Sequence, residues 1–488
     1  MVRVLFVIAL VLLAAAVVES QEQWLKRQAI NALLHLDRAD AQAQAAARAY
    51  AEARAEVRSR AEAYARAKAK LASDEGFRDE ALDLDYMRVI RLYLDTVAHW
   101  PNEKFGPITM RTRMLSMYHK LILTILVYAE ISALFLVRVR MTTHGFIDLG
   151  QDYLSILMSF VMITRMTLIL QEKYCSLIKN FVSKFHLLNH KHESEFAAKE
   201  YRKVNKICRI ATIVILLECL IGQVMFNAVP IYVNIEAGLF TDHAHRPPNA
   251  TFVHFVNYYF IIDQYSDAIG YTIVSLLNGF ISYICGVAFC GLDLLIYVLV
   301  FHILGHFNIL VDKMRSFPIP ISFPDESSNR QYNEEAFKIL KNLIQHDQLI
   351  KEFMNDTSNT FGITLFICLL FHQVSGCISL LEISPMTAEA LTRYGPLILV
   401  LFNQLIQMSV IFELISSKSN FLSDDAYALP WELMNNKNRK TLLLFLMNVQ
   451  RPRALKAGGL VSVGVLTMSQ ILKNSFSYFL MLKTLGNV

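Results

Sequence analysis

The chain has 488 residues, of which 54% are apolar and 18% charged, and its formal net charge is +5. With 11% aromatic residues and a positive mean hydropathy, this composition is typical of an integral membrane protein and excludes an ordinary soluble domain. A net charge this small gives no reason to expect a nucleic-acid partner, because loop lysines near a membrane account for it.

The seven cysteines lie in or beside apolar segments and form no Cys-x-x-Cys pair. The sequence therefore predicts neither a disulfide framework nor a metal site. It also lacks a glycine-rich phosphate loop, a metal-spaced histidine cluster and a nucleophile elbow, so we expect neither an enzyme nor a bound cofactor. The histidines of the polar loops are expected to be solvated or structural.

The first 80 residues differ in character from the rest. Residues 1–20 combine an early arginine, an apolar run and a short polar end, which is the three-part layout of a secretory signal peptide. Residues 21–80 are rich in Ala, Arg and Glu and favour a solvated helix without a core of its own. We expect residues 21–80 to be foreign to the membrane domain at 81–488, joined to it by a gene-model error or a fusion. A genuine secreted-type leader is the alternative.

Seven apolar segments follow, and together they predict an all-α, polytopic membrane protein with seven transmembrane helices. The seventh is expected to be broken into two parts. A polar, turn-forming run from Ser423 to Trp431 precedes a short helix at Thr441–Val449, and a longer helix is expected at Leu460–Leu482. The first six segments are expected near Leu115–Val137, Leu149–Leu170, Ile207–Val233, Tyr271–Leu304, Phe361–Glu382 and Tyr394–Ile415.

Loop charges predict the orientation of these helices. Lys and Arg are concentrated in the loops Gln171–Lys206, Gly305–Asp356 and Ser416–Lys440, whereas the alternate loops carry few. The heavily charged loops should be cytoplasmic, which places the start of the membrane domain inside and the C-terminus outside. Asn249 begins an Asn-x-Thr sequon in a loop predicted to be extracellular, so we predict that it is glycosylated.

Polar residues within apolar segments are the first candidates for a site. Glu218 and Gln223 lie just over one turn apart in the third segment. They could be the polar anchors of a ligand cavity or could form interhelical hydrogen bonds that fix packing. Arg165 lies toward the predicted inner end of the second segment and is expected to snorkel. Asp293 and Glu413 are expected to make packing or loop contacts.

Apolar and aromatic side chains recur at helical spacing in the outer halves of segments two to six. Such stripes are core by default, but a cavity for a small apolar ligand needs the same apolar walls with a few polar groups, and both interpretations stay open. Besides Glu218 and Gln223, the candidate ligand-binding residues are Tyr153, Ile156, Leu157, Phe160, Gly222, Phe226, Tyr271, Val274, Leu277, Phe371 and Val374.

The last helix carries many polar residues for a membrane span, which favours a bundle interior or a water-filled pore over lipid. Ser469, Lys473 and Ser477 are candidates for the wall of a conduction path. Met481 and Leu485 are candidates for an apolar constriction near its outer end, since such constrictions gate by dewetting. Simple packing against neighbouring helices is the alternative.

Several short motifs are concentrated near the C-terminus: Tyr427 with Pro430-Trp431, Asn438-Arg439, Met447 with Gln450-Arg451-Pro452, Ala457-Gly458 and Ser477-Tyr478-Phe479. Together with the seven segments and the inside N-terminus, these motifs resemble those of the insect odorant receptors. The resemblance covers about residue 82 to the end.

The resemblance implies a tetrameric, ligand-gated, non-selective cation channel that responds to small volatiles in the plasma membrane of olfactory sensory neurons. Met481 and Leu485 would fall at its gate. The loop between segments four and five lacks the long insertion typical of the olfactory coreceptor, which implies an odorant-tuned subunit that pairs with that coreceptor. The subunits would meet through an anchor that contains Tyr427, Trp431, Arg439 and Met447.

Three alternatives stay open. A gustatory receptor has the same architecture and differs in its closing motif. A G-protein-coupled receptor is disfavoured by the loop charges and by the absence of its Asp-Arg-Tyr and Asn-Pro-x-x-Tyr motifs. A transporter would show broken helices at corresponding positions of two matched halves, whereas only the last segment is predicted to be broken.

Overall fold

The computed structural model describes residues 80–143, 149–240, 251–254, 256, 257, 259, 263–320, 325–384 and 387–486. All of them belong to one compact unit, Gly76–Val488. The predicted leader at 1–20 and the predicted prefix at 21–80, apart from its last residue, lie outside the described residues. The predicted glycosylation site Asn249 does too.

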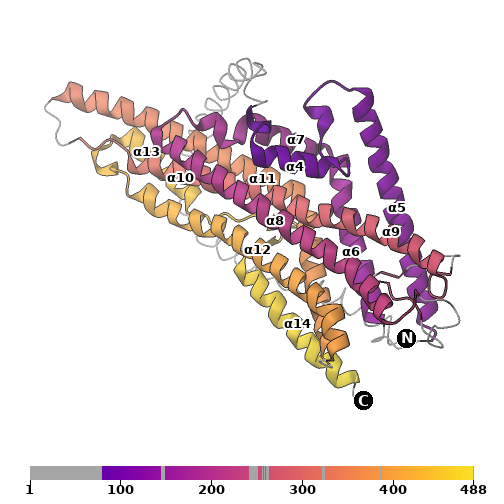
Figure 1. Ribbon diagram of the computed structural model, residues 1–488. Coiled ribbons are helices and arrows are strands. Elements are labelled where there is room, and N and C mark those ends of the chain that lie inside the picture. The colour runs from indigo at the N-terminus through magenta and orange to yellow at the C-terminus, as the bar shows by residue number, and fades with distance from the viewer. Residues whose placement is uncertain are drawn as a thin grey trace. The chain divides into compact units, whose positions relative to one another are not determined.

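The described secondary-structure elements are helices, apart from one short hairpin (Figure 1). Its elements are α4 (Asp85–Asp95), η1 (Asn102–Lys104), α5 (Met110–Arg140), α6 (Gly150–Met166), η3 (Thr167–Leu170), α7 (Glu172–Asn180), η4 (Phe181–Phe185), η5 (Leu187–His190), α8 (Glu195–Glu236), α9 (Ala268–Gly286), η7 (Val287–Gly291), α10 (Leu292–Arg315), α11 (Glu326–Ile383), α12 (Ala388–Tyr427), η8 (Trp431–Leu433), α13 (Asn436–Val449), β1 (Lys456–Ala457), β2 (Val461–Ser462) and α14 (Val465–Gly486).

Six helices of the described part are long and apolar enough to cross a membrane, by length and composition. They are α5, α6 with η3, α8, the continuous run α9–η7–α10, α11 and α12. Each of the first six predicted segments falls on one of them. The prediction of an all-α, polytopic membrane protein is confirmed. The predicted orientation, with the start of the membrane domain inside and the C-terminus outside, stays a prediction.

The predicted break in the last segment is present, and the hairpin β1–β2 separates α13 from α14. Gly458 and Gly459, with φ of 59° and 74°, form the turn of this hairpin. These are left-handed conformations that glycine adopts without steric cost. The backbone N–H of Gly458 donates to the carbonyl of Gly362 in α11 at 2.7 Å, which fixes the hairpin against that helix.

Three predicted boundaries near this break are wrong. Ser423–Tyr427 forms the end of α12 rather than a turn, and the helix stops before Pro430. α13 begins at Asn436 instead of Thr441, because the Asn435 side chain caps it by accepting from the backbone N–H of Asn438 at 2.9 Å. α14 begins at Val465 instead of Leu460, because the residues between them complete the hairpin.

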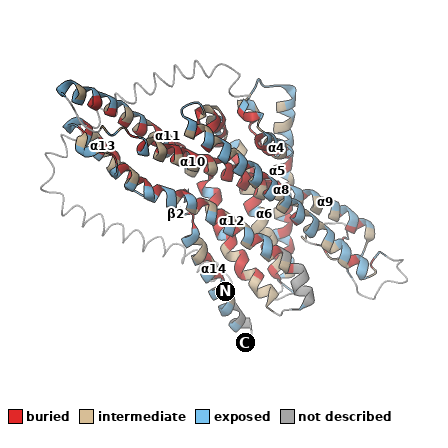
Figure 2. Ribbon diagram, turned by 60° about the vertical axis from the view of Figure 1, so that its left-hand side comes forward, coloured by how far each residue is buried: buried red, intermediate tan, exposed pale blue. Residues whose placement is uncertain are grey.

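α10 is the buried centre of the bundle. Of its 24 residues, 17 are buried, including the run Leu292–Val300. α8, α11 and α12 pack against it, while Figure 2 shows many exposed residues on α9 and α14. Where such packing replaces contacts with lipid, van der Waals fit and interhelical hydrogen bonds stabilise the bundle more than the hydrophobic effect does.

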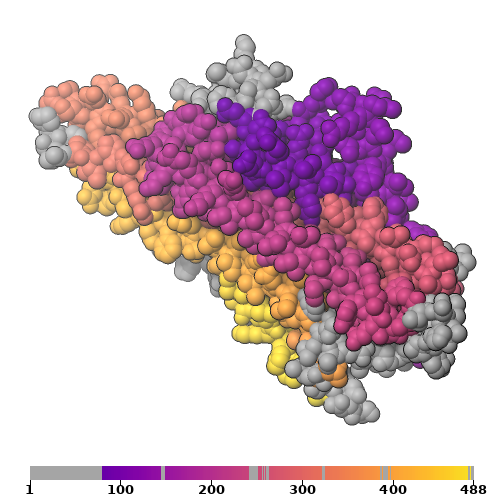
Figure 3. All heavy atoms as spheres, viewed as in Figure 1, coloured from indigo at the N-terminus to yellow at the C-terminus, as the bar shows by residue number. Residues whose placement is uncertain are grey.

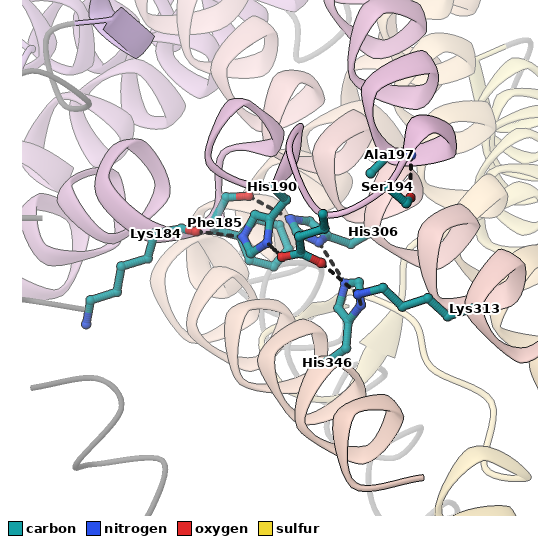
Figure 4. A network of polar contacts seen from close by, with 9 residues as sticks. Lys184, Phe185, His190, Ser194, Ala197, His306, Lys313 and His346 are labelled. Atoms are coloured by element: carbon teal, nitrogen blue, oxygen red, sulfur yellow. Dashed lines mark hydrogen bonds and ion pairs between the residues drawn. The ribbon is translucent and has the colours of Figure 1, made fainter. Parts of the chain in front are cut away.

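A chain of polar contacts ties the segment between α7 and α8 to α10 and α11 (Figure 4). Both ring nitrogens of His190 face acceptors, the carboxylate of Glu193 at 2.6 Å and the carbonyl of Lys184 at 3.0 Å. Lys313 donates to Glu193 at 2.7 Å and reaches a ring nitrogen of His346 at 3.3 Å. His346 in turn contacts His306 at 2.9 Å. His190 is thus buried and structural, as expected for a loop histidine.

A second contact chain joins α4 to the same segment. The hydroxyl of Tyr86 lies 2.7 Å from Nε2 of His186 and 3.1 Å from Nε2 of His302. Nδ1 of each ring accepts a backbone N–H, from Leu188 and Leu187 respectively. A ring nitrogen that accepts a hydrogen bond carries no proton of its own, so these contacts favour the neutral form of both histidines.

We expect the thermal midpoint of the purified protein to fall as the pH is lowered from 7.5 to 5. Burial, together with the nearby His190, lowers the pKa of His186 to about 3. The unfolded chain therefore takes up a proton below about pH 6.5 that the folded protein does not. The stability that this residue contributes is complete above pH 6.5 and is lost as the pH falls toward 3, by about 2 kcal/mol at pH 5.

The matched variant His186→Asn tests this assignment. It should melt at a lower temperature than the wild type at pH 7.5, because a buried hydrogen bond is lost, but its midpoint should fall less between pH 7.5 and 5. An equal fall in the two proteins would show that His186 is not the titrating group.

The stability that Glu193 contributes is also lost on acidification, but at lower pH than that of His186. Burial alone would raise its pKa, but the hydrogen bond and charge of His190 and the Lys313 ammonium hold the pKa well below its usual range.

Candidate functional site

A cavity of about 460 Å³ lies among α6, α8, α9, α10 and α12. This volume is in the range of pockets that enclose small molecules. Most of its wall is apolar, contributed by residues such as Met158, Phe226, Ile281 and Leu401. The polar residues of the wall include Glu218, Gln223, Asn278, Tyr297 and Gln407.

Five of the predicted ligand-binding residues line this cavity: Glu218, Gly222, Gln223, Phe226 and Phe371. All but one come from α8, where the prediction followed polar residues within an apolar segment. The structure places the other eight outside the lining: Tyr153, Ile156, Leu157, Phe160, Tyr271, Val274, Leu277 and Val374.

The predicted residues of α6 lie on another face of the helix than the one that lines the cavity. Ser155, Met158, Ser159 and Met162 line the cavity, whereas the side chain of Phe160 is 50% exposed. Both faces of α6 are rich in apolar residues, so periodicity in the sequence could not select the one that faces the cavity.

The predicted residues of α9 lie nearer the start of the helix than those that line the cavity. Tyr271 stacks on Phe252 with ring centroids 4.5 Å apart and belongs to a separate cluster with Leu239. The cavity is instead lined by α9 residues from Asn278 to Gly286. Because Asn278 follows Tyr271 by seven residues, or two helical turns, the two residues lie on the same face of α9 at different depths.

Arg165 does not snorkel, which corrects the prediction from sequence. Its side chain is 3% exposed and pairs with Asp293 at 2.8 Å. It also donates to the backbone carbonyls of Ala288 and Phe289 at 3.2 and 3.1 Å. The expectation that Asp293 makes a packing contact holds, but its partner is a buried cation from α6.

The carbonyls that Arg165 reaches belong to η7, a single π-helical turn between α9 and α10. A π-turn shifts the backbone hydrogen bonds of the helix and often marks a functional segment. Arg165 therefore satisfies this irregular turn and the Asp293 carboxylate together, beside the wall of the cavity. Such a contact cannot be found by inspecting the sequence of either helix alone.

α8 and α12 adjoin along the face seen in Figure 3. Across this seam Nε2 of Gln407 donates to both carboxylate oxygens of Glu218, at 2.7 and 2.9 Å. One turn away on α12, Nε2 of Gln404 donates to Asp293 at 2.6 Å. Neither glutamine was predicted from the sequence, although both are polar residues within an apolar segment, the same signal that identified Glu218.

α14 packs one side against α11 and α12 and exposes the other. Ser475 is buried and contacts Gln373 of α11. Of the predicted pore residues, Lys473, Ser477 and Met481 are exposed and Ser469 is half-buried. Leu485 belongs to α14, but its side chain lies outside the described part of the structure.

The predicted anchor residues lie at the junction of α12, η8 and α13. Tyr427, Trp431 and Met447 are 64%, 41% and 58% exposed, respectively. Arg439 is exposed as well, and its guanidinium donates to the carbonyls of Trp431 and Glu432 at 3.0 and 2.7 Å, which ties α13 to η8. All four side chains thus lie at the surface of the chain, and Arg439 also positions the segment that bears Trp431.

The model of the family described as "7tm Odorant receptor" matches residues 145–476. Among curated relatives, odorant receptor 67c of Drosophila melanogaster is 22% identical over 206 residues, which are 42% of this chain and 48% of the relative. Odorant receptor 85c of the same species is 26% identical over 161 residues, 32% of this chain and 40% of the relative. The chain thus spans about half the length of the curated relatives or less.

Solved structures of olfactory receptor OR5 from Machilis hrabei share the fold. One covers 81% of this chain and 97% of its own with a TM-score of 0.64 at 11% identity. A second, in complex with eugenol, covers 83% and 100% with a TM-score of 0.66 at 12% identity.

Proposed function

The chain belongs to the 7tm odorant receptor family, and on that premise we propose that it is an odorant-tuned subunit of a ligand-gated, non-selective cation channel. This is a family of sensory receptors and not of enzymes. The observation that supports the proposal best is a largely apolar cavity of about 460 Å³ inside a bundle of membrane-spanning helices. The similar structure of OR5 has been solved with eugenol, a small volatile molecule.

The arrangement of α11, α12 and α14 supports a route from ligand to pore. Phe371 of α11 lines the cavity, and Ser475 of α14 contacts Gln373 two residues further along α11. A ligand that fits the open arrangement better than the closed one would shift the equilibrium by its difference in affinity. In this proposal the exposed face of α14 lines the pore, and Met481 with Leu485 forms its apolar constriction.

The proposed partner is the olfactory coreceptor, in a heterotetramer in the plasma membrane of olfactory sensory neurons. α10 ends at Arg315 and α11 begins at Glu326, so only a short connection stands where the coreceptor has its long insertion. The exposed side chains of Tyr427, Trp431 and Met447 are the proposed contacts between subunits.

Whole-cell current tests the proposal. Cells that express the full chain with an insect coreceptor should show an inward cation current on exposure to a panel of volatiles. The current should survive blockade of G proteins, and cells lacking either subunit should not give the same response. Absence of current with both proteins at the cell surface would count against the channel proposal.

Substituted cysteines on α14 test the pore assignment. A current through Ser477→Cys channels should be reduced by a positively charged methanethiosulfonate reagent, because the Ser477 side chain is exposed. The matched control is Ser475→Cys, two residues away on the buried side of the same helix. It should respond to the reagent no more than the wild type, which has seven cysteines of its own. Equal inhibition of both variants would contradict a pore-facing Ser477.

A further inference from the structure

We propose that this cavity selects volatiles whose polar end donates a hydrogen bond, and that the carboxylate of Glu218 accepts it. The inference rests on the proposed function, because it assumes that the cavity holds the odorant. It adds a chemical class of ligand, namely small apolar molecules that end in a hydroxyl or an amino group.

The two carboxylates described in the cavity wall differ in their partners. Two carboxylates line it, Glu218 and Asp293. Asp293 is neutralised by Arg165 at 2.8 Å and receives a further hydrogen bond from Gln404. Among the ion pairs of the described residues none includes Glu218, and the described residues that line the cavity include no Lys or Arg. Glu218 is thus the carboxylate in this wall whose charge lacks a cationic partner.

The hydrogen bonds of Glu218 leave room for a ligand. Its two oxygens accept from a single amide nitrogen, Nε2 of Gln407. An ionised carboxylate offers about four lone-pair sites, so acceptor capacity remains. A donor on the ligand would add a charge-assisted hydrogen bond, the stronger kind.

The other polar atoms of the wall favour a donor over an acceptor ligand. Gln223 is occupied by Ser282: its Nε2 donates to the Ser282 carbonyl at 2.6 Å and its Oε1 accepts from the Ser282 hydroxyl at 3.0 Å. Oδ1 of Asn278 is buried without a partner among the described residues, and it can only accept. The hydroxyl of Tyr297 is also buried without one, and it can donate or accept. Of these two buried wall atoms without a partner, one can only accept a hydrogen bond and the other can donate or accept.

Matched ligands test the inference. The probes are primary alcohols of four to ten carbons, the primary amines of the same chains and the methyl ethers of the same alcohols. Ethers keep the oxygen but cannot donate. In cells that express the full chain with a coreceptor, the best alcohol or amine should act at a roughly tenfold or more lower concentration than its ether, the factor expected for a hydrogen bond to a charged group. Equal potency of alcohols and ethers would overturn the inference.

Comparison of the two donor classes identifies the ligand charge. Amines that outperform alcohols of equal length would show that Glu218 pairs with a cationic ligand. Alcohols that match or exceed amines would show that it accepts from a neutral donor. Either result supports the donor class when the more potent of the two classes also acts at a lower concentration than the ethers.

The double variant Glu218→Leu with Gln407→Leu assigns the preference to this pair. Removing both partners leaves no unpaired group behind, so folding should be nearly unaffected. Its response to ethers should persist, while the advantage of alcohols and amines should be lost. The control Ser155→Ala removes another polar group of the wall, a hydroxyl that donates to the Gln151 carbonyl of its own helix at 2.9 Å, and should keep the advantage. A double variant that still prefers donors would exclude Glu218 as their acceptor.

Ligand-induced stabilisation of the purified protein separates failure of this inference from failure of the proposed function. Alcohols or amines that raise the thermal midpoint more than ethers, without any current, would support the inference and contradict the channel. A current with equal responses to ethers and alcohols would support the channel and contradict the inference. No shift with any of the three classes would count against the inference.

Discussion

The variant Asp293→Leu is expected to lose about 3–5 kcal/mol of stability and to be retained inside the cell, because it leaves the Arg165 guanidinium buried without a counter-ion. The ion pair is only 3% and 6% exposed at its two side chains. Surface labelling of intact cells and the thermal midpoint of the purified protein measure the effect.

Removing both charges should recover part of this loss. In the double variant Arg165→Met with Asp293→Leu no charge is buried alone, and apolar replacements of buried ion pairs are often tolerated. Recovery should be incomplete, because the carbonyls of Ala288 and Phe289 lose the donor that Arg165 provides. As a control, Asp85→Ala removes an exposed partner of Arg209 at 3.8 Å and should cost well under about 1 kcal/mol. Normal surface expression of Asp293→Leu would show that the pair is dispensable.

The variant Asp347→Leu is expected to abolish the ligand-evoked current and to destabilise the protein by about 3–5 kcal/mol, again because a buried cation loses its partner. Arg453, in the connection between α13 and α14, makes two parallel hydrogen bonds to Asp347 of α11 at 2.7 and 2.8 Å. Its backbone N–H also donates to Ser419 of α12 at 2.9 Å. The pair thus holds the start of the proposed pore segment against two helices.

The control for this experiment lies on the same helix. Glu334 of α11 pairs with Arg330 at 3.3 Å, with both side chains exposed. Glu334→Ala should therefore leave current and thermal midpoint near those of the wild type. If Asp347→Leu responds as well as Glu334→Ala, the connection between α13 and α14 is not held by this ion pair.

The positions of the membrane helices could be predicted because each is a long apolar run bounded by more polar segments. The break before α14 could also be predicted, since Gly458 and Gly459 mark a turn. The end of α12 was not, because Asp424 and Asp425 suggested a turn in a stretch that the structure shows as helix.

The candidate site was less predictable because it depends on which helices meet. Glu218 could be singled out as a polar residue in an apolar segment, but its partner Gln407 lies 189 positions away. Arg165 looked like a residue that reaches for the membrane surface, and only the packing of α6 against η7 shows that it is buried. The anchor and pore assignments stay predictions that the subunit interfaces of an assembled channel would test.

The π-turn at Val287–Gly291 has a consequence for comparing relatives of this protein. A turn of this kind holds one residue more than the α-helical turn it replaces, and one residue corresponds to a rotation of about 100°. The cavity-lining half in α9 and the buried half in α10 therefore keep separate angular phases along one continuous helix. A relative that lacks the extra residue would align correctly on one side of the turn and out of phase on the other. A one-residue gap placed at η7 restores both.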